Sequence, residues 1–225
     1  MHPHLQNAVW RSLSGPQSRF ATGTGNARRY APGFSPIVGF AEPARPDLDA
    51  LRPYCSEDEH FYCSGWSGLA PAAWRIDAES TMYCMVWNGG RAPVDELPEA
   101  LLLGGEHAAM ALELATLTRP GPFGPRTPEL GEYFGVFEAG RLVAMAGERL
   151  QVDGYREISG VCTLAERQGR GYARCLMNKL IRRQLQRAQR PFLHVMRDNT
   201  AARALYRRMG FVDVEEVVVR VIAPR

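Results

Sequence analysis

Apolar and polar positions in the second half of the chain recur with periods that predict helices and strands in a mixed order. Residues 106–117, EHAAMALELATL, are nearly all strong helix formers, and the Pro- and Gly-rich run at 118–128 ends that helix. Residues 133–137 and 141–146 are apolar runs on either side of a short EAG turn, which predicts a tight hairpin. A third strand is predicted over 155–164.

A helix and two further strands are predicted after this strand. Apolar residues recur every three or four positions over 173–181, which is typical of a helix with one apolar face. Strands are predicted at 191–196 and 214–222, with a short helix between them that Asn199 caps and Gly210 ends. Hairpins mixed with strand–helix–strand crossovers predict an α/β (α+β) fold, with a mixed, mostly antiparallel sheet and helices on both faces.

The first hundred residues are rich in Pro, Gly and Trp, and their pattern is less regular. Short apolar runs at 37–40 and 82–87 predict strands between turns. Turn-forming and acidic residues mix at 88–103. We therefore predict a smaller α/β half at 1–100 and a second half at 101–225 that meet in this segment.

Composition indicates a soluble globular protein. Of its 225 residues, 45% are hydrophobic and 23% are charged, and no run approaches the roughly 20 apolar residues of a membrane span. The opening MHPHLQNAVWRSL lacks a basic segment followed by an apolar core. We therefore expect no secretory signal, no membrane contact and a cytoplasmic location.

Cysteine and histidine usage gives no indication of a metal site. The five cysteines are an odd number, are widely spaced and form no CxxC pair, which argues against both a disulfide framework and a zinc knuckle. The histidines do not fall at metal-ligand spacings with them. No bound metal is expected.

Charge is distributed unevenly along the chain. The net charge, 27 − 24 = +3, is too small to imply a polyanionic partner, but arginines gather at 167–190. The later ones are expected on the exposed end of a helix, where cations suit the helix dipole. No aromatic platform accompanies them, so no nucleic-acid partner is expected. These four residues are Arg182, Arg183, Arg187 and Arg190.

The segment QGRGYA at 168–173 joins a predicted strand directly to a predicted helix. Its glycines, Gly169 and Gly171, let the backbone turn sharply, so that several N–H groups face one point. An anion there would also meet the positive end of the helix dipole and nearby arginines. The segment completes neither a P-loop nor a GxGxxG motif, so it predicts a phosphate site of another kind.

Two signatures make this region resemble the GNAT superfamily of acetyl-CoA-dependent N-acetyltransferases. That family's cofactor loop, Q or R, two residues, G, one residue, G or A, is matched in full at 168–173. A strand, an Asn and a helix ending in LYxxxGF appear as FLHVMRDNTAARALYRRMGF at 192–211. The resemblance covers at least 131–219. The opening HPHLQNAVWRSLSGP, with TRPGPF and RLVAMAGERL, resembles a subset of bacterial GNAT proteins that carry an extra N-terminal half.

The resemblance implies a GNAT-like sheet and a site for acetyl-CoA. Backbone groups near Val161 and Thr163 would pair with the pantetheine arm like an added strand. Asn199 would contact that arm, and Tyr206 would protonate or hydrogen-bond the leaving sulfur. Seven residues, about two helical turns, separate Asn199 and Tyr206, so both are expected on one side of their helix. The implied cofactor-binding residues are Val161, Cys162, Thr163, Gln168, Gly169, Arg170, Gly171, Tyr172, Ala173, Asn199 and Tyr206.

Glu157 is the predicted catalytic base. Odd-numbered residues from 157 to 163 are expected to share one face of their strand, and Glu157 lies 168 − 157 = 11 residues before Gln168, as the catalytic glutamate does in histone-acetylating GNAT members. A protonated amine must lose its proton to attack a thioester, and Glu157 would accept it more readily if burial raised its pKa. Glu148 is the reserve base, and His194 is expected to be a packed core histidine.

Together these features predict an N-acetyltransferase that moves an acetyl or short acyl group from acetyl-CoA to a primary amine by direct attack on the thioester. The acceptor is expected to be a small-molecule or peptide amine. The protein is expected to be a monomer or a homodimer. The N-terminal half has no second glycine loop, so we expect a degenerate copy of the catalytic half or a separate cap on the acceptor side, without its own cofactor. The alternative is a regulatory protein that binds CoA without turnover.

Overall fold

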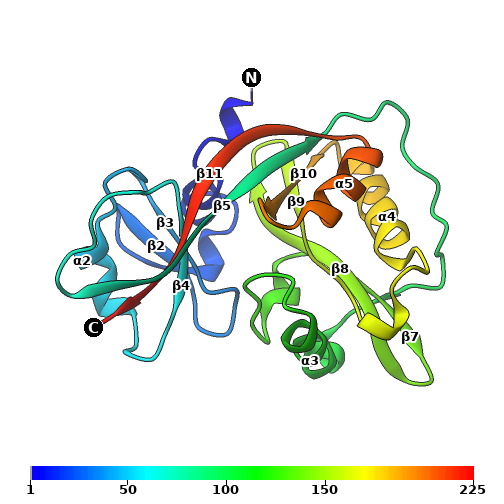
Figure 1. Ribbon diagram of the computed structural model, residues 1–225, viewed down its shortest axis with the longest axis horizontal. Helices are drawn as coiled ribbons and strands as arrows, with labels where there is room; N and C mark the ends of the chain where they lie inside the picture. Colours follow the sequence, from blue (N-terminus) through cyan, green and yellow to red (C-terminus); the bar gives the residue numbers. More distant parts are fainter. Residues whose placement is uncertain (1) are drawn as a thin grey trace.

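One continuous sheet runs through the whole molecule in the computed structural model, which describes residues 2–225 (Figure 1). Over those residues it is eleven-stranded and mostly antiparallel, which confirms the predicted mixed sheet. From edge to edge the strands are β1 (Ala21–Gly23), β2 (Ala27–Tyr30), β3 (Ile37–Phe40), β4 (Phe61–Ser64), β11 (Phe211–Pro224), β5 (Trp74–Trp87), β10 (Arg190–Met196), β9 (Tyr155–Thr163), β8 (Arg141–Val152), β7 (Tyr133–Glu138) and β6 (Leu101–Leu102).

Two long strands, β5 and β11, join the halves of the molecule. They pair antiparallel along their whole length, from Phe211 opposite Trp87 to Pro224 opposite Trp74. In Figure 1 they arch together from the first half, coloured blue to cyan, to the second half, coloured green to orange. This long hydrogen-bonded ladder makes one sheet out of two.

Each half of the sheet receives one of these strands from the other half of the sequence. The second edge of β5 pairs with β10, from Phe192 opposite Val86 to Met196 opposite Met82. The second edge of β11 pairs with β4. The predicted division at residue 100 therefore does not coincide with a break in the sheet, because a strand from before that residue lies inside the second half.

The five α-helices of the described chain cover both faces of the sheet, as predicted. α4 (Tyr172–Gln186) packs on β8, β9 and β10, and α3 (Ala108–Thr118) packs on β8 and β9 from the opposite face. The apolar face predicted for α4 is confirmed, because Leu176, Met177, Leu180 and Ile181 are fully buried and Ala173 is partly buried. The other helices are α1 (Ala8–Ser14), α2 (Leu48–Leu51) and α5 (Thr200–Arg208).

The two halves share one order of strand pairing. In the first half, antiparallel β1, β2 and β3 are followed by a parallel β3–β4 pair that α2 connects. In the second half, antiparallel β7, β8 and β9 are followed by a parallel β9–β10 pair that α4 connects. In both halves, the next strand is antiparallel and comes from the other half.

Removing the first hundred residues should prevent the second half from folding. A fragment of residues 101–225 lacks β5, so β10 and β11 each lose a partner strand and the buried Met85 and Trp87 leave the core. We expect no cooperative thermal transition for this fragment by circular dichroism. The control is a fragment of residues 72–225, which retains β5 and should recover a transition. A transition for the shorter fragment equal to that of the full chain would show that the second half folds without β5.

Candidate functional site

The parallel strands β9 and β10 pair at their beginning and then separate. Their ladder consists of Tyr155 opposite Arg190, Pro191 opposite Arg156, and Phe192 opposite Glu157, and it ends there. Further along, β9 pairs only with β8, and β10 only with β5. One edge of each strand therefore faces a gap, and a strand edge of this kind can accept an extended ligand through backbone hydrogen bonds. Residues 161–163, predicted to bind the cofactor, lie on this part of β9.

A cavity of about 370 Å³ lies at this gap and extends towards the first half of the chain. Strand residues at its wall include Gly160, Val161 and His194, and the loop after α3 contributes Arg119. The first half contributes further residues, namely Val9, Ile37, Tyr62, Ser64 and Met82. The cavity is thus built by both halves, and only their packing against the common sheet brings these residues together.

The predicted phosphate loop lies immediately before α4. Gly169 and Gly171 have φ values of +78° and +82°, the left-handed region that favours glycine. A Cβ added at Gly169 would meet nothing within 4 Å, so the space beside the loop is open. Gly171 is the N-cap of α4 and supplies no side-chain cap, which leaves the first N–H groups of the helix available to an anion.

Arginines around this loop form ion pairs near the surface. Arg167 and Arg170 lie 2.7 and 3.3 Å from Glu138, and Arg174 contacts Glu96 at 2.5 Å. A hydrogen bond from Tyr172 and the two arginines lower the pKa of Glu138. Because ion pairs this exposed contribute little to stability, the guanidinium groups can exchange their partners for a phosphate.

Tyr206 and Asn199 both line the cavity, so the structure brings these two predicted residues together. The Asn199 side chain accepts a hydrogen bond from Ala202 N at 3.1 Å, which confirms it as the cap of α5. Tyr206 is only 9% exposed, and burial raises its pKa to about 12. Its hydroxyl therefore stays protonated at neutral pH and can act as a donor.

A β-bulge in β9 changes which side chains share a face. Between Ser159 and Cys162, β9 advances three residues while β8 advances two. Gly160, inside this segment, has φ of +63°. The expectation that all odd-numbered residues from 157 to 163 share one face is therefore wrong, because the extra residue puts Cys162, instead of Val161, on the face of Ser159. Cys162 itself is buried, and burial raises its pKa to about 11.

Glu157 lies in a fully buried ion pair. Its two oxygens accept hydrogen bonds from Arg149 at 2.9 and 2.8 Å, from Leu150 N at 3.1 Å and from His194 Nδ1 at 2.7 Å. Burial by itself would raise the pKa of Glu157, the change that would suit a base, but the charge of Arg149 and the hydrogen bonds from His194 and Arg149 lower it well below the usual range. The carboxylate is therefore ionised throughout the neutral range.

His194 connects this ion pair to the cavity. Its side chain is 13% exposed and lines the cavity wall, while Nδ1 faces Glu157. Burial by itself would lower the pKa of His194, but contacts with Cys84 and Glu157 raise it to about 10. The residue is packed, as expected, but it is also a cation at neutral pH. The one signal in the sequence was a polar residue within the apolar run 191–196.

The reserve base, Glu148, does not reach the cavity. It is 1% exposed and accepts hydrogen bonds from Arg156 and Gln184 at 3.0 Å each, with Arg187 as a further partner. Gln184 lies in the last turn of α4, and Arg187 is its C-cap. Arg183 and Arg187 are exposed at this end of the helix, as expected, and they also pair with carboxylates, Arg183 with Glu132 and Arg187 with Glu148. Glu148 has a structural environment on the α4 side of the sheet.

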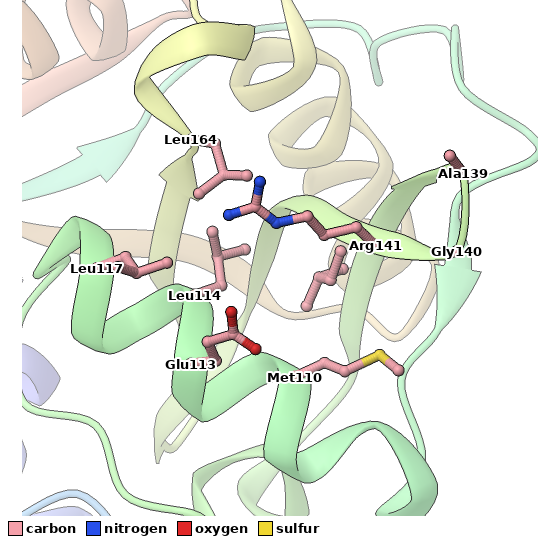
Figure 2. Close-up of a pocket in the computed structure, with 9 residues that line it drawn as sticks. Met110, Glu113, Leu114, Leu117, Ala139, Gly140, Arg141 and Leu164 are labelled. Carbon is pink, nitrogen blue, oxygen red and sulfur yellow. The ribbon is translucent and has the colours of Figure 1, made fainter.

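A second depression, of about 250 Å³, lies between α3 and the turn that joins β7 to β8. Figure 2 shows the Arg141 side chain crossing it towards Leu164, with Glu113 and Leu114 on α3. Its walls are mainly aliphatic, and Arg141 also pairs with Glu166 at 3.2 Å. None of the predicted site residues lines this depression.

Two features found at the cavity were not predicted from the sequence. Arg149 and Arg119 both line it, although each was read as part of a strand or a loop.

Across residues 2–225, no helix is long and apolar enough to cross a membrane, and no group of three potential metal ligands occurs.

Comparison with known proteins relates the whole chain to one group. Residues 133–220 match the family of FR47-like proteins. A structure from Novosphingobium aromaticivorans, assigned to the GNAT family of acetyltransferases, is 30% identical, covers 98% of each chain and superposes with a TM-score of 0.88. No curated protein matches the chain in sequence.

More distant structures share the fold. A GCN5-related N-acetyltransferase from Kribbella flavida is 19% identical, with 98% of this chain and 93% of that chain covered and a TM-score of 0.58. A similar protein from Streptococcus suis is 16% identical, with 97% and 92% covered and a TM-score of 0.59. At these identities the likeness concerns the architecture only.

Glu157→Gln should destabilise the protein. The substitution leaves the buried Arg149 without its counter-charge, which typically costs about 3–5 kcal/mol of unfolding free energy. Urea unfolding at pH 7 measures the loss. The control is Glu129→Gln, which breaks a pair whose side chains are 51% and 49% exposed and should cost less than about 1 kcal/mol. If the Glu157 variant kept full stability and lost only turnover, a direct base would be the better assignment.

Acid should remove the same stabilisation from the wild type. The pKa of Glu157 is lowered in the folded state, so its contribution is complete above the unfolded value of about 4.3 and is lost as pH falls below it. We expect the stability difference between wild type and Glu157→Gln to narrow from pH 5 to pH 3. A constant difference across this range would show that the ionised carboxylate is not its source.

Proposed function

Because the chain belongs to the GNAT family of acetyltransferases, we propose that it transfers an acetyl or other short acyl group from acetyl-CoA to a primary amine. The observation that carries this proposal is the early end of the β9–β10 ladder, at a cavity that the buried Tyr206 also lines. A free strand edge and a proton donor thus share one cavity, and β9 leads along the chain into the glycine loop before α4. The acceptor is a small-molecule or peptide amine.

The residues at this cavity and those at the start of α4 together fit acetyl-CoA. The uncapped start of α4 and the open space at Gly169 suit a pyrophosphate. The free edge of β9 near Val161 and Thr163 suits the amide groups of a pantetheine arm, which can pair as a short added strand. Cys162 contributes only backbone to this edge, since its side chain is buried in the core.

Bound acetyl-CoA would supply a thioester: the amine nitrogen bonds to its carbonyl carbon, the carbon–sulfur bond breaks, and CoA leaves as a thiol after taking up a proton. Arg149 and His194 hold positive charge at the cavity wall. This charge lowers the pKa of a nearby ammonium, so more of the amine is neutral, and it favours negative charge that develops on the carbonyl oxygen. Water takes the proton that the amine loses.

Glu157 acts in this proposal as a positioning residue. Its depressed pKa makes it a weak proton acceptor at neutral pH, while its hydrogen bonds hold Arg149 and His194 in place. Tyr206 is protonated at the pH where the thiolate leaves, so its hydroxyl can donate to the sulfur.

A second candidate is a regulatory protein that binds CoA without turnover. The saturated environment of Glu157 favours it, because no carboxylate side chain lines the described cavity wall to act as a direct base. Thiol release from acetyl-CoA in the presence of a broad amine panel separates the two. Binding of CoA with no acetylation of any amine would support the regulatory role.

Gly171→Glu should weaken acetyl-CoA binding. A side chain at φ of +82° strains the loop, and its negative charge would enter the site for the pyrophosphate. We expect calorimetric affinity to fall by about tenfold or more, or about 1.4 kcal/mol. The matched control is Gly154→Glu, where an exposed glycine in the β8–β9 turn has φ of +72° and open space around it. Equal affinity for both variants would contradict the loop assignment.

Tyr206→Phe should lower turnover and leave acetyl-CoA affinity nearly unchanged. The hydroxyl is needed when the sulfur leaves, whereas the ring keeps its packing against Phe211. We expect kcat to fall by about 100-fold, within the usual range for loss of an acid catalyst. Steady-state kinetics beside calorimetry test this. Parallel losses of kcat and affinity would mean that Tyr206 serves packing instead.

A further inference from the structure

The acceptor side of the cavity carries positive charge. Among the described residues that line it, Arg119, Arg149 and His194 are cationic, and no aspartate or glutamate is present. A simple alkylamine enters such a cavity as an ammonium ion and is repelled by it. A molecule that carries a negative group beside its amine is attracted instead.

Arg119 differs from the other two cations in having no counter-charge. Arg149 and His194 lie 2.8 and 2.7 Å from Glu157. Arg119 is exposed, and no described residue forms an ion pair with it. It also lines an adjoining depression of about 210 Å³ that it shares with Tyr62. Arg119 therefore lies where the loop after α3 meets the first half of the chain.

The backbone conformation at Arg119 is one that glycine normally adopts. The residue ends α3 in the left-handed region, with φ of +50° and ψ of +57°, and its N–H bonds to Ala115 O at 2.8 Å. Glycine is favoured at this position of a helix because a side chain is strained there. A strained arginine without an ion pair, at the wall of a cavity, suggests a role in ligand binding.

We propose that the acceptor carries a carboxylate close to its amine, as free amino acids and dipeptides do, and that Arg119 binds this carboxylate. The inference rests on the proposed acetyl transfer and specifies its substrate class. A guanidinium group matches a carboxylate with two parallel hydrogen bonds, so Arg119 would fix the orientation of the acceptor as well as its charge. Tyr62 and Ser64 also line the cavity and provide hydroxyl groups.

The test compares free amino acids and dipeptides with the same compounds as carboxamides, in an assay of thiol release from acetyl-CoA. We expect kcat/KM to favour the carboxylates by about 10- to 100-fold, the range of a charge-assisted hydrogen-bonded pair. Arg119→Gly should remove this preference through a higher KM for the carboxylates. Arg119→Lys should retain part of it, because the charge remains and the paired geometry is lost.

Two further measurements separate binding from folding. Arg119→Gly relieves the strained backbone, so its Tm should equal or exceed that of the wild type, and its calorimetric affinity for acetyl-CoA should be unchanged. Arg182→Gln, which removes an exposed arginine on α4, is the control and should alter neither the preference nor the Tm.

Each other outcome has a distinct meaning. Equal acetylation of acids and amides, or an equal loss for both in Arg119→Gly, overturns the role of Arg119. Acetyl-CoA binding without acetylation of any carboxylate overturns this acceptor class and leaves the donor site standing. A failure to bind acetyl-CoA overturns the proposed function itself, and this inference with it.

Discussion

The pairing of β5 with β11 is the interaction on which the rest of this molecule depends. It is the longest ladder in the sheet, and it carries β5 into the second half and β11 into the first. Because β5 holds one edge of β10, β10 can leave β9 after only three residue pairs without losing all of its hydrogen bonds. The gap at the cavity and the closeness of the first half to it both follow from this placement of β5 in the second half and β11 in the first.

A buried group of charges determines the chemistry at that gap. Glu157 is ionised because Arg149 and His194 surround it, and the two cations are held at the cavity wall because Glu157 is there. Burial alone would raise the pKa of a carboxylate, whereas burial beside two cations leaves the pKa of Glu157 lowered. The positive wall bears on both the proposed deprotonation of the amine and the proposed selection of the acceptor, since one electrostatic field acts on both groups.

The matching pairing order of the two halves supports the interpretation of the first as a degenerate copy of the second.

Local features of the site could be predicted from the sequence. The buried face of α4, the left-handed glycines of the phosphate loop and the Asn199 cap follow from residue periodicity and backbone preferences within a few positions. The shared face expected for Glu157 and its alternate neighbours was wrong, because a single extra residue at Gly160 reverses the alternation. Strict alternation holds only while a strand is regular, and the isolated Gly160 within the predicted strand was the one local signal of the bulge.

By itself, the sequence determined the kind and order of the main helices and strands in the second half, the anion-binding loop and the family resemblance, since each of these rests on neighbouring residues. The tertiary structure alone decided where β5 lies, which residues of the first half reach the cavity, and that Glu157 has a depressed pKa. Those outcomes depend on contacts between residues far apart in the chain. Strand order and the partners of a buried charge are set when the whole sheet assembles, because only then are hydrogen bonds and counter-charges assigned.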